Sequence, residues 1–167
     1  MRLIKFKAKH KDWKTNSNRN RWIYGFYLSR AETTYCFSED YERNPVATLH
    51  FIAEETMTDW GLPNTFRLYE IDPDTLCQFS GLVDKNGTEI YENNICSTDL
   101  AVPYKTVVFR NGCFMYKCND GEDYYDIMMP IDPLVDADDY TEVIGNIYDE
   151  EHTEDEMECI SLQHEHT

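Results

Sequence analysis

Two Asn-Gly pairs, Asn86-Gly87 and Asn111-Gly112, lie between apolar segments and restrict the fold more than any other feature of the chain. Asparagine and glycine tolerate positive φ, which both central positions of a type I′ turn require. That turn joins antiparallel strands because its twist matches theirs. The sequence therefore predicts a β-hairpin at each pair, with a structural and not a reactive role.

Asn93 and Asn94 follow the short strand that the first pair introduces. Asparagine adopts left-handed backbone more readily than most residues. We therefore expect a kink at these positions, after which Ile95 returns to the core. Asn86, Gly87, Asn93 and Asn94 are thus the predicted structural turn residues of the central segment.

Short alternating segments recur along the chain. Residues 22–28 are rich in aromatic side chains and alternate as a strand with a buried face does. Asp72 before Pro73 is typical of a helix cap, and residues 53–60 predict a short helix. We expect a mainly β protein with little helix, with further strands at residues 3–7, 34–37, 47–52, 66–71, 89–91, 105–110, 113–117 and 142–148.

The chain has 167 residues, enough for one domain or for two small halves that share a core. Its N-terminus lacks the apolar run of a signal peptide, so we expect its six cysteines to be free thiols in a reducing cytoplasm. No stretch approaches the roughly 20 apolar residues of a membrane helix, so we expect no membrane partner.

The formal charge of -17 is divided unevenly. Residues 1–30 carry nine Lys and Arg against one acid, a net +8, and the rest carries six against 31, a net -25. Clustered cations with aromatic neighbours are typical of a surface that contacts a polyanion. The predicted contacts are Lys5, Lys7, Arg19 and Arg21. Solvent-facing side chains, or a ribbon lying against the acidic remainder, are the alternatives.

The C-terminal segment is strongly acidic, with seven acids in residues 149–158. Such a block repels itself and seldom orders alone. We expect residues 150–167 to form a mobile tail. The alternative is an acidic surface that mimics DNA, although a mimic needs its carboxylates on a rigid frame.

A central block resembles the YopX family, small proteins of bacteriophages and prophages. It consists of DPDT at residues 72–75, QFSGL at 78–82 and DKNGTEIYE at 84–92. Weaker matches flank it: IKFKA at 4–8, WIYG at 22–25 and VIGNIY at 143–148. In the family pattern Gly-Asp follows the Tyr-Glu pair, where this chain has Asn93-Asn94. No carboxylate role therefore carries over to Asn94.

The resemblance implies a partly open β-barrel whose C-terminal half is similar to SH3-like modules. We expect an N-terminal β segment at residues 1–70 and the SH3-like half at 71–149, with the two sharing one core. The resemblance also implies a bacterial host cell and a phage or prophage accessory protein, and it brings no known reaction with it.

Signals for catalysis or for bound groups are weak. His10 and His50 lie in no nucleophile motif, and the sequence contains no Gly-rich phosphate loop. Cys113 and Cys118 have no second pair at zinc-ligand spacing. Residues 136–142 lack the glycine of an EF-hand calcium loop. The remaining interpretations of this acidic segment are a loosely bound cation or a solvated loop. We expect no catalytic residue, no cofactor and no built metal site.

Binding is the remaining class of function. Tyr104, Tyr124 and Tyr125 are predicted either to pack in the core or to serve a protein interface, where an amphipathic ring is useful. We expect a non-enzymatic module that binds a host or phage protein, with self-association through an exposed β edge as a further option. The alternative is a nucleic-acid-related module.

Overall fold

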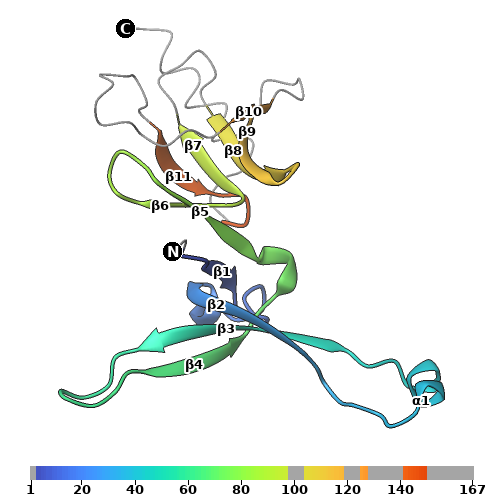
Figure 1. The fold of residues 1–167 in the computed structure, drawn as a ribbon. Coiled ribbons are helices and arrows are strands. Elements are labelled where there is room, and N and C mark those ends of the chain that lie inside the picture. Colours follow the sequence, from blue (N-terminus) through green and yellow to red (C-terminus); the bar gives the residue numbers. More distant parts are fainter. Residues whose placement is uncertain (1–2, 98–103, 119–124, 128–140, 150–167) are drawn as a thin grey trace, which may run out of the picture. The chain divides into compact units, whose positions relative to one another are not determined.

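The computed structural model describes residues 3–97, 104–118, 125–127 and 141–149. The chain divides into two compact units, Leu3–Gln78 and Phe79–Thr167, each of which is built on antiparallel strands (Figure 1). The units meet along the chain within a single strand, whereas the sequence placed the boundary after residue 70.

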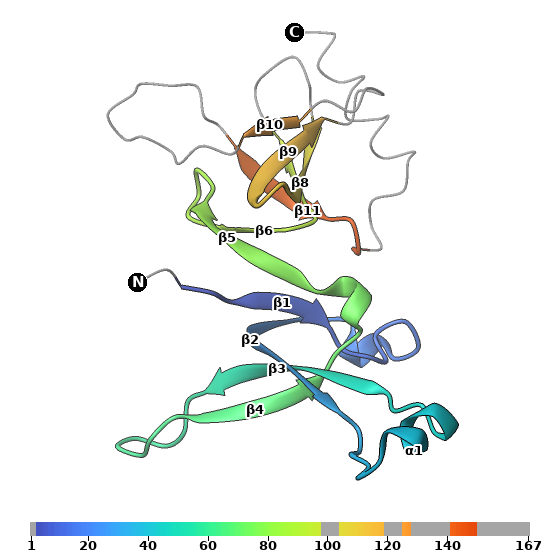
Figure 2. The same cartoon turned by 45° about the vertical axis from the view of Figure 1, so that its right-hand side comes forward.

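Unit 1 is a twisted antiparallel sheet. From its edge inward it contains β4 (Thr65–Glu70), β3 (Thr48–Thr56), β2 (Trp22–Ala31), β1 (Phe6–Lys9) and the first residues of β5 (Cys77–Val83). The β3–β4 loop lies at one end of these strands and the short helix α1 (Ser38–Arg43) at the other (Figure 2).

One face of this sheet carries the core of unit 1. Ala8, Ile23, Ile52 and Ile71 are buried together, and Tyr27 packs against them. Strands β2 and β3 approach closely at Gly25, where a Cβ atom would overlap the carbonyl oxygen of Ala53. A glycine is therefore required there.

Unit 2 contains a second sheet in the order β10, β9, β8, β7, β11, together with the pair formed by β5 and β6 (Glu89–Tyr91). Its core consists of Ile90, Cys96, Val107 and Phe114. No closed barrel is detected among the residues that the structure describes, so the SH3-like description remains a prediction. The strands are β7 (Asn94–Ser97), β8 (Tyr104–Arg110), β9 (Cys113–Cys118), β10 (Tyr125–Ile127) and β11 (Glu142–Asn146).

The two Asn-Gly pairs turn the chain differently. Asn111 and Gly112 have φ values of 52° and 84° between the paired residues at the ends of β8 and β9, as a type I′ hairpin requires. At the first pair only Gly87 has positive φ, so the type I′ prediction for Asn86-Gly87 is wrong. Asn93, with φ of 62°, confirms the predicted kink.

Two predicted elements are wrong. Residues 53–56 belong to β3, where pairing with β2 and β4 overrides the helix predicted at 53–60. Residues 34–37 lie in no strand and precede α1. The predicted cap is confirmed, because the Asp72 side chain accepts a hydrogen bond from Asp74 N before the 3-10 helix Pro73–Thr75. The sequence missed β5, β7 and β10.

Candidate interaction surface

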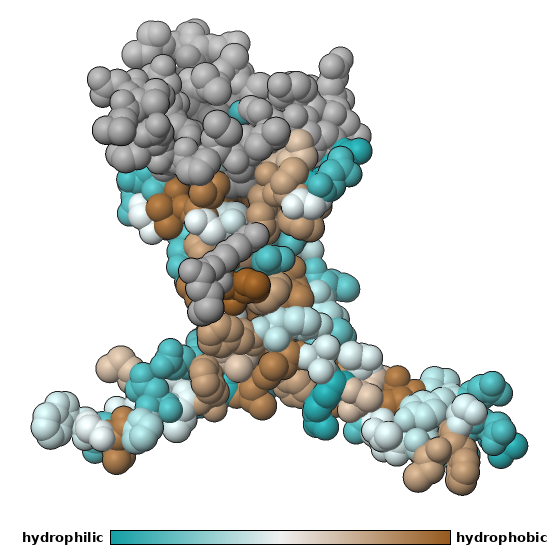
Figure 3. All heavy atoms as spheres, viewed as in Figure 1, coloured by the Kyte–Doolittle hydropathy of each residue, from teal (hydrophilic) through white to brown (hydrophobic). Residues whose placement is uncertain are grey.

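The second face of the unit 1 sheet is apolar and largely uncovered. The alternation of β2 places Tyr24, Phe26 and Leu28 on this face, with exposed fractions of 45%, 44% and 47%. On β4, Phe66 and Leu68 are 60% and 58% exposed. Figure 3 shows apolar side chains, in brown, on the surface of unit 1 around its strands.

Cross-strand pairing joins these side chains into one surface. Phe26 lies opposite Ala53, which in turn lies opposite Leu68, and Leu28 lies opposite Phe51. The ring centroids of Phe26 and Phe66 are 6.0 Å apart in an edge-to-face arrangement. We call this surface the apolar face: Tyr24, Phe26, Leu28, Phe51, Phe66 and Leu68.

The apolar face is large for an exposed patch. Five of its side chains are each about half exposed, so they offer on the order of 400 Å² of apolar surface. Single exposed apolar residues are ordinary, whereas the largest contiguous patch of a soluble monomer, roughly 300–600 Å², is often functional. The sequence alternation at residues 22–28 indicated the strand, but not that this face would stay uncovered.

The basic residues of β1 are buried on this side of the sheet. Lys7 and Lys9 are only 5% and 4% exposed. Their Nζ atoms lie 4.5 Å and 4.6 Å from the centre of the Trp22 ring, and Lys9 also donates to Asn20 Oδ1 at 2.9 Å. The ring attracts the cations electrostatically while their stems cover apolar surface. Lys7 is therefore a packing residue and not a solvent-facing one.

Two of the other predicted polyanion contacts, Arg19 and Arg21, also have partners within unit 1. Arg19 is 2.9 Å from Asp12 Oδ2, and Arg21 lies 3.6 Å from Glu54 Oε1 and over the Tyr69 ring. Lys5 is half-buried. Polyanion binding by these four residues stays a prediction, and their placement adds no support to it.

His10 lies beside the Arg19–Asp12 pair. Burial lowers the pKa of this imidazole, and the nearby Arg19 lowers it further, while Asp12 acts in the opposite direction. The ring has a structural role: its Nδ1 accepts a hydrogen bond from Asp12 N at 3.2 Å. Nothing in its surroundings pairs it with a nucleophile among the described residues.

The central turn of unit 2 is organised by the buried carboxylate of Asp84. One oxygen accepts hydrogen bonds from Asn86 N and Thr88 N, both at 2.8 Å, and the other accepts from Val143 N at 3.0 Å. Burial alone would raise the pKa of Asp84, but these backbone hydrogen bonds outweigh it and hold the pKa below its usual value. The carboxylate therefore fastens the turn to β11 and serves as scaffold.

Asn94 has a similar role at the kink. Its Oδ1 accepts from Tyr91 N at 2.7 Å, and its Nδ2 donates to the carbonyl oxygen of Gly145 at 2.9 Å. A carboxylate could not make the second bond, because it has no hydrogen to donate. The amide that stands in place of the acid in the family pattern thus ties β6 and β7 to β11.

The tyrosines predicted for an interface are only partly described. Tyr104 begins β8 and is 9% exposed, and burial raises the pKa of its hydroxyl. Little of its ring is available to a partner. Tyr124 lies outside the described residues, and of Tyr125 the structure describes only the backbone in β10.

Metal and membrane features are limited to what the described residues show. No group of three or more His, Cys, Asp or Glu side chains among them lies close enough to hold a metal ion, and residues 136–140 lie outside the description. Cys36, Cys77, Cys96 and Cys113 are not joined in disulfide bonds. The only α-helix in the described ranges has six residues, too few to cross a bilayer.

Comparisons with known proteins identify a family. No curated protein matches the chain. Among solved structures, protein EF1440 from Enterococcus faecalis is similar, with 16% sequence identity, a TM-score of 0.42, and coverage of 88% of this chain and 94% of that chain. The family model described as YopX protein matches residues 7–152. Since that match spans most of the 167 residues, the chain belongs to the YopX family.

Proposed function

We propose that the chain is a non-catalytic protein-binding module that presents the apolar face to a protein partner. The proposal rests on the exposure of that face: five large apolar side chains share one sheet surface and are each about half exposed. A phage or prophage accessory role, with a host or phage protein as partner and an SH3-like second half, is part of the same proposal.

The chemistry of the face favours protein over nucleic acid. Aromatic side chains are enriched at protein interfaces, and charged residues are depleted at their centres. The cations on this side are engaged with rings of unit 1: Lys7 and Lys9 with Trp22, and Arg30, whose Cζ lies 5.7 Å from the centre of the Phe51 ring. A strand surface of this kind suits a partner that brings its own apolar side chains.

The test compares a face variant with a matched control. Phe26→Thr/Leu68→Thr removes apolar surface and introduces threonine, a β-branched residue that suits a strand, at both positions. Phe37→Thr removes an aromatic side chain that is 67% exposed but lies outside the face. Proteins captured from infected or lysogenic host lysate by the wild-type chain are purified, and their Kd is measured for the wild type, the face variant and the control.

We expect the double variant to weaken binding by about 100-fold, since each lost anchor contributes roughly tenfold. The control should stay within about twofold of wild type. Unchanged Kd in the double variant contradicts the proposal. So does a partner whose affinity falls steeply with salt, because that response indicates phosphate contacts.

A further inference from the structure

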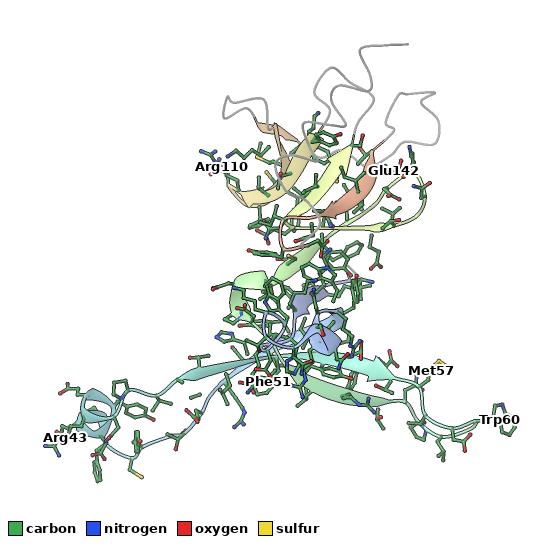
Figure 4. All side chains as sticks on the ribbon, turned by 180° about the vertical axis from the view of Figure 1, so that it is seen from behind. Arg43, Phe51, Met57, Trp60, Arg110 and Glu142 are labelled. Carbon is green, nitrogen blue, oxygen red and sulfur yellow. The ribbon has the colours of Figure 1, made fainter. Side chains whose placement is uncertain are left out.

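The loop between β3 and β4 carries three exposed apolar side chains at the end of a hairpin. Trp60 is 97% exposed, Met57 83% and Leu62 62%. Figure 4 shows Trp60 at the outer end of this hairpin, with Met57 nearer the strands and Phe51 at the base. We call residues 57–64 the hairpin tip. The sequence missed it because residues 53–60 were assigned to a helix.

Hydrogen bonds give the hairpin tip a defined shape. The Thr58 hydroxyl donates to the carbonyl oxygen of Pro63 at 2.8 Å. The carbonyl oxygen of Leu62 lies 3.2 Å from the same hydroxyl. Asp59 Oδ1 accepts from Trp60 N at 2.8 Å, and Leu62 N donates to Asp59 O at 3.0 Å. Because the backbone of the hairpin tip is already ordered, less conformational entropy is lost when a partner binds the indole.

The charge around the hairpin tip is negative. Asp59 lies on the tip and Glu55 just before it, and residues 57–64 contain no Lys or Arg, whereas Glu54, nearer the sheet, is paired with Arg21. Anionic lipid surfaces and nucleic acids attract basic segments, so neither complements this tip. A second copy is also disfavoured, because two chains of formal charge -17 repel each other. The complement is an apolar pocket with a cationic rim.

We propose that Trp60 is an anchor that inserts into an apolar pocket, rimmed by Lys or Arg, on the protein partner. The proposal rests on the protein-binding function above and adds a second, separate contact to it. Tryptophan is among the residues most enriched at the energetic centres of interfaces, where a large ring fills a desolvated pocket. Asp59, next to the indole, is placed to meet the cationic rim.

Three variants test the anchor with the purified partner. Trp60→Ala removes a side chain that is almost fully exposed, so the fold is retained. We expect it to weaken Kd by about 30-fold or more, whereas Phe37→Ala stays within about twofold. Asp59→Asn keeps the oxygen that accepts from Trp60 N but removes the charge. It should slow association by about threefold and weaken the dependence of that rate on salt.

The same variants separate this inference from the protein-binding proposal. If the apolar-face variant loses binding and Trp60→Ala does not, the anchor is wrong and the protein-binding function stands. If neither variant changes Kd, both are wrong. If Phe37→Ala weakens Kd as much as Trp60→Ala, the effect is not specific to the anchor and the inference is overturned.

Two further measurements address other occupants of the tip. Fluorescence of the chain with vesicles of phosphatidylcholine, alone or mixed with phosphatidylglycerol, should show no blue shift. A shift that Trp60→Ala abolishes assigns the tip to a lipid surface and overturns the inference. Sedimentation velocity should show no self-association that depends on Trp60. A dimer lost in Trp60→Ala assigns the tip to a second copy and overturns it as well.

Discussion

Unit 1 exposes large apolar side chains together on one sheet face, whereas the buried side chains of Asp84 and Asn94 in unit 2 hold its strands together by hydrogen bonds. Phe66 and Leu68 in unit 1 are more than half exposed, while Asp84 and Asn94 in unit 2 are 3% and 2% exposed. Exposed apolar patches and buried polar side chains both depart from the usual distribution of residues, and they are therefore the informative observations. The difference separates the surface that we propose for binding from polar groups that hold the framework together.

The buried polar groups of unit 2 are satisfied. No buried side-chain nitrogen or oxygen among the described residues lacks a hydrogen-bond partner. Asn146, fully buried, donates to Glu92 O at 3.4 Å and accepts from Tyr148 N at 3.1 Å. Removing such a group leaves its partners unsatisfied, so changes here should lower stability. Changes on the apolar face of unit 1 should alter binding instead.

The largest expected effect is that of Asp84→Ala. The variant removes the acceptor of three backbone N–H groups, at Asn86, Thr88 and Val143, so we expect a loss of about 3 kcal/mol in the free energy of unfolding. Urea unfolding followed by circular dichroism measures the loss, and hydrogen exchange locates it at Thr88 and Val143. Asp84→Asn is the matched control. It retains one oxygen for Asn86 and Thr88, and it should lose less.

Asn94→Asp should have the next largest effect. At neutral pH the carboxylate oxygen faces the carbonyl oxygen of Gly145, and the donated hydrogen bond is lost. We expect a loss of about 2 kcal/mol in the free energy of unfolding at pH 7, measured by urea unfolding. The difference from wild type should shrink at acidic pH, where a protonated carboxyl can donate. Equal stability at pH 7 would show that the acid of the family pattern fits this site.

The local features of the fold were predictable from sequence. The type I′ turn at Asn111-Gly112 and the left-handed Asn93 follow from the residues themselves, because their φ values depend on local chemistry. The alternation of residues 22–28 also identified β2. These predictions needed no information about distant parts of the chain.

The features that failed depend on residues far apart in sequence. The turn at Asn86-Gly87 is shaped by a carboxylate that also binds Val143 N, 59 positions away from Asp84. Residues 53–56 form a strand because β2 and β4 lie on both sides. Lys7 is buried because β2 brings the Trp22 ring beneath it. The apolar face was missed because alternation cannot tell which face of a sheet stays uncovered, and the hairpin tip was missed because the helix predicted at residues 53–60 hid the β3–β4 pairing.

Acidification should weaken the turn of unit 2 through Asp84. Its pKa is lower in the folded protein than in the unfolded chain, so the unfolded chain binds the proton more readily. The stabilisation is complete above the unfolded pKa of about 3.9 and is lost as the pH falls through the folded pKa. The urea midpoints of wild type and Asp84→Asn, measured from neutral to acidic pH, should converge at the acidic end. A constant difference would contradict this assignment.

Leu68→Thr should have the smallest effect on stability. Leu68 is 58% exposed on the edge strand β4, so we expect a change below about 0.5 kcal/mol in the free energy of unfolding. Ile52→Thr, on the core face of β3, should cost about 3 kcal/mol by the same measurement, because Ile52 is fully buried. If Leu68→Thr destabilised the protein as much as Ile52→Thr, another part of the chain would have to cover the apolar face. The binding proposal would then lose its surface.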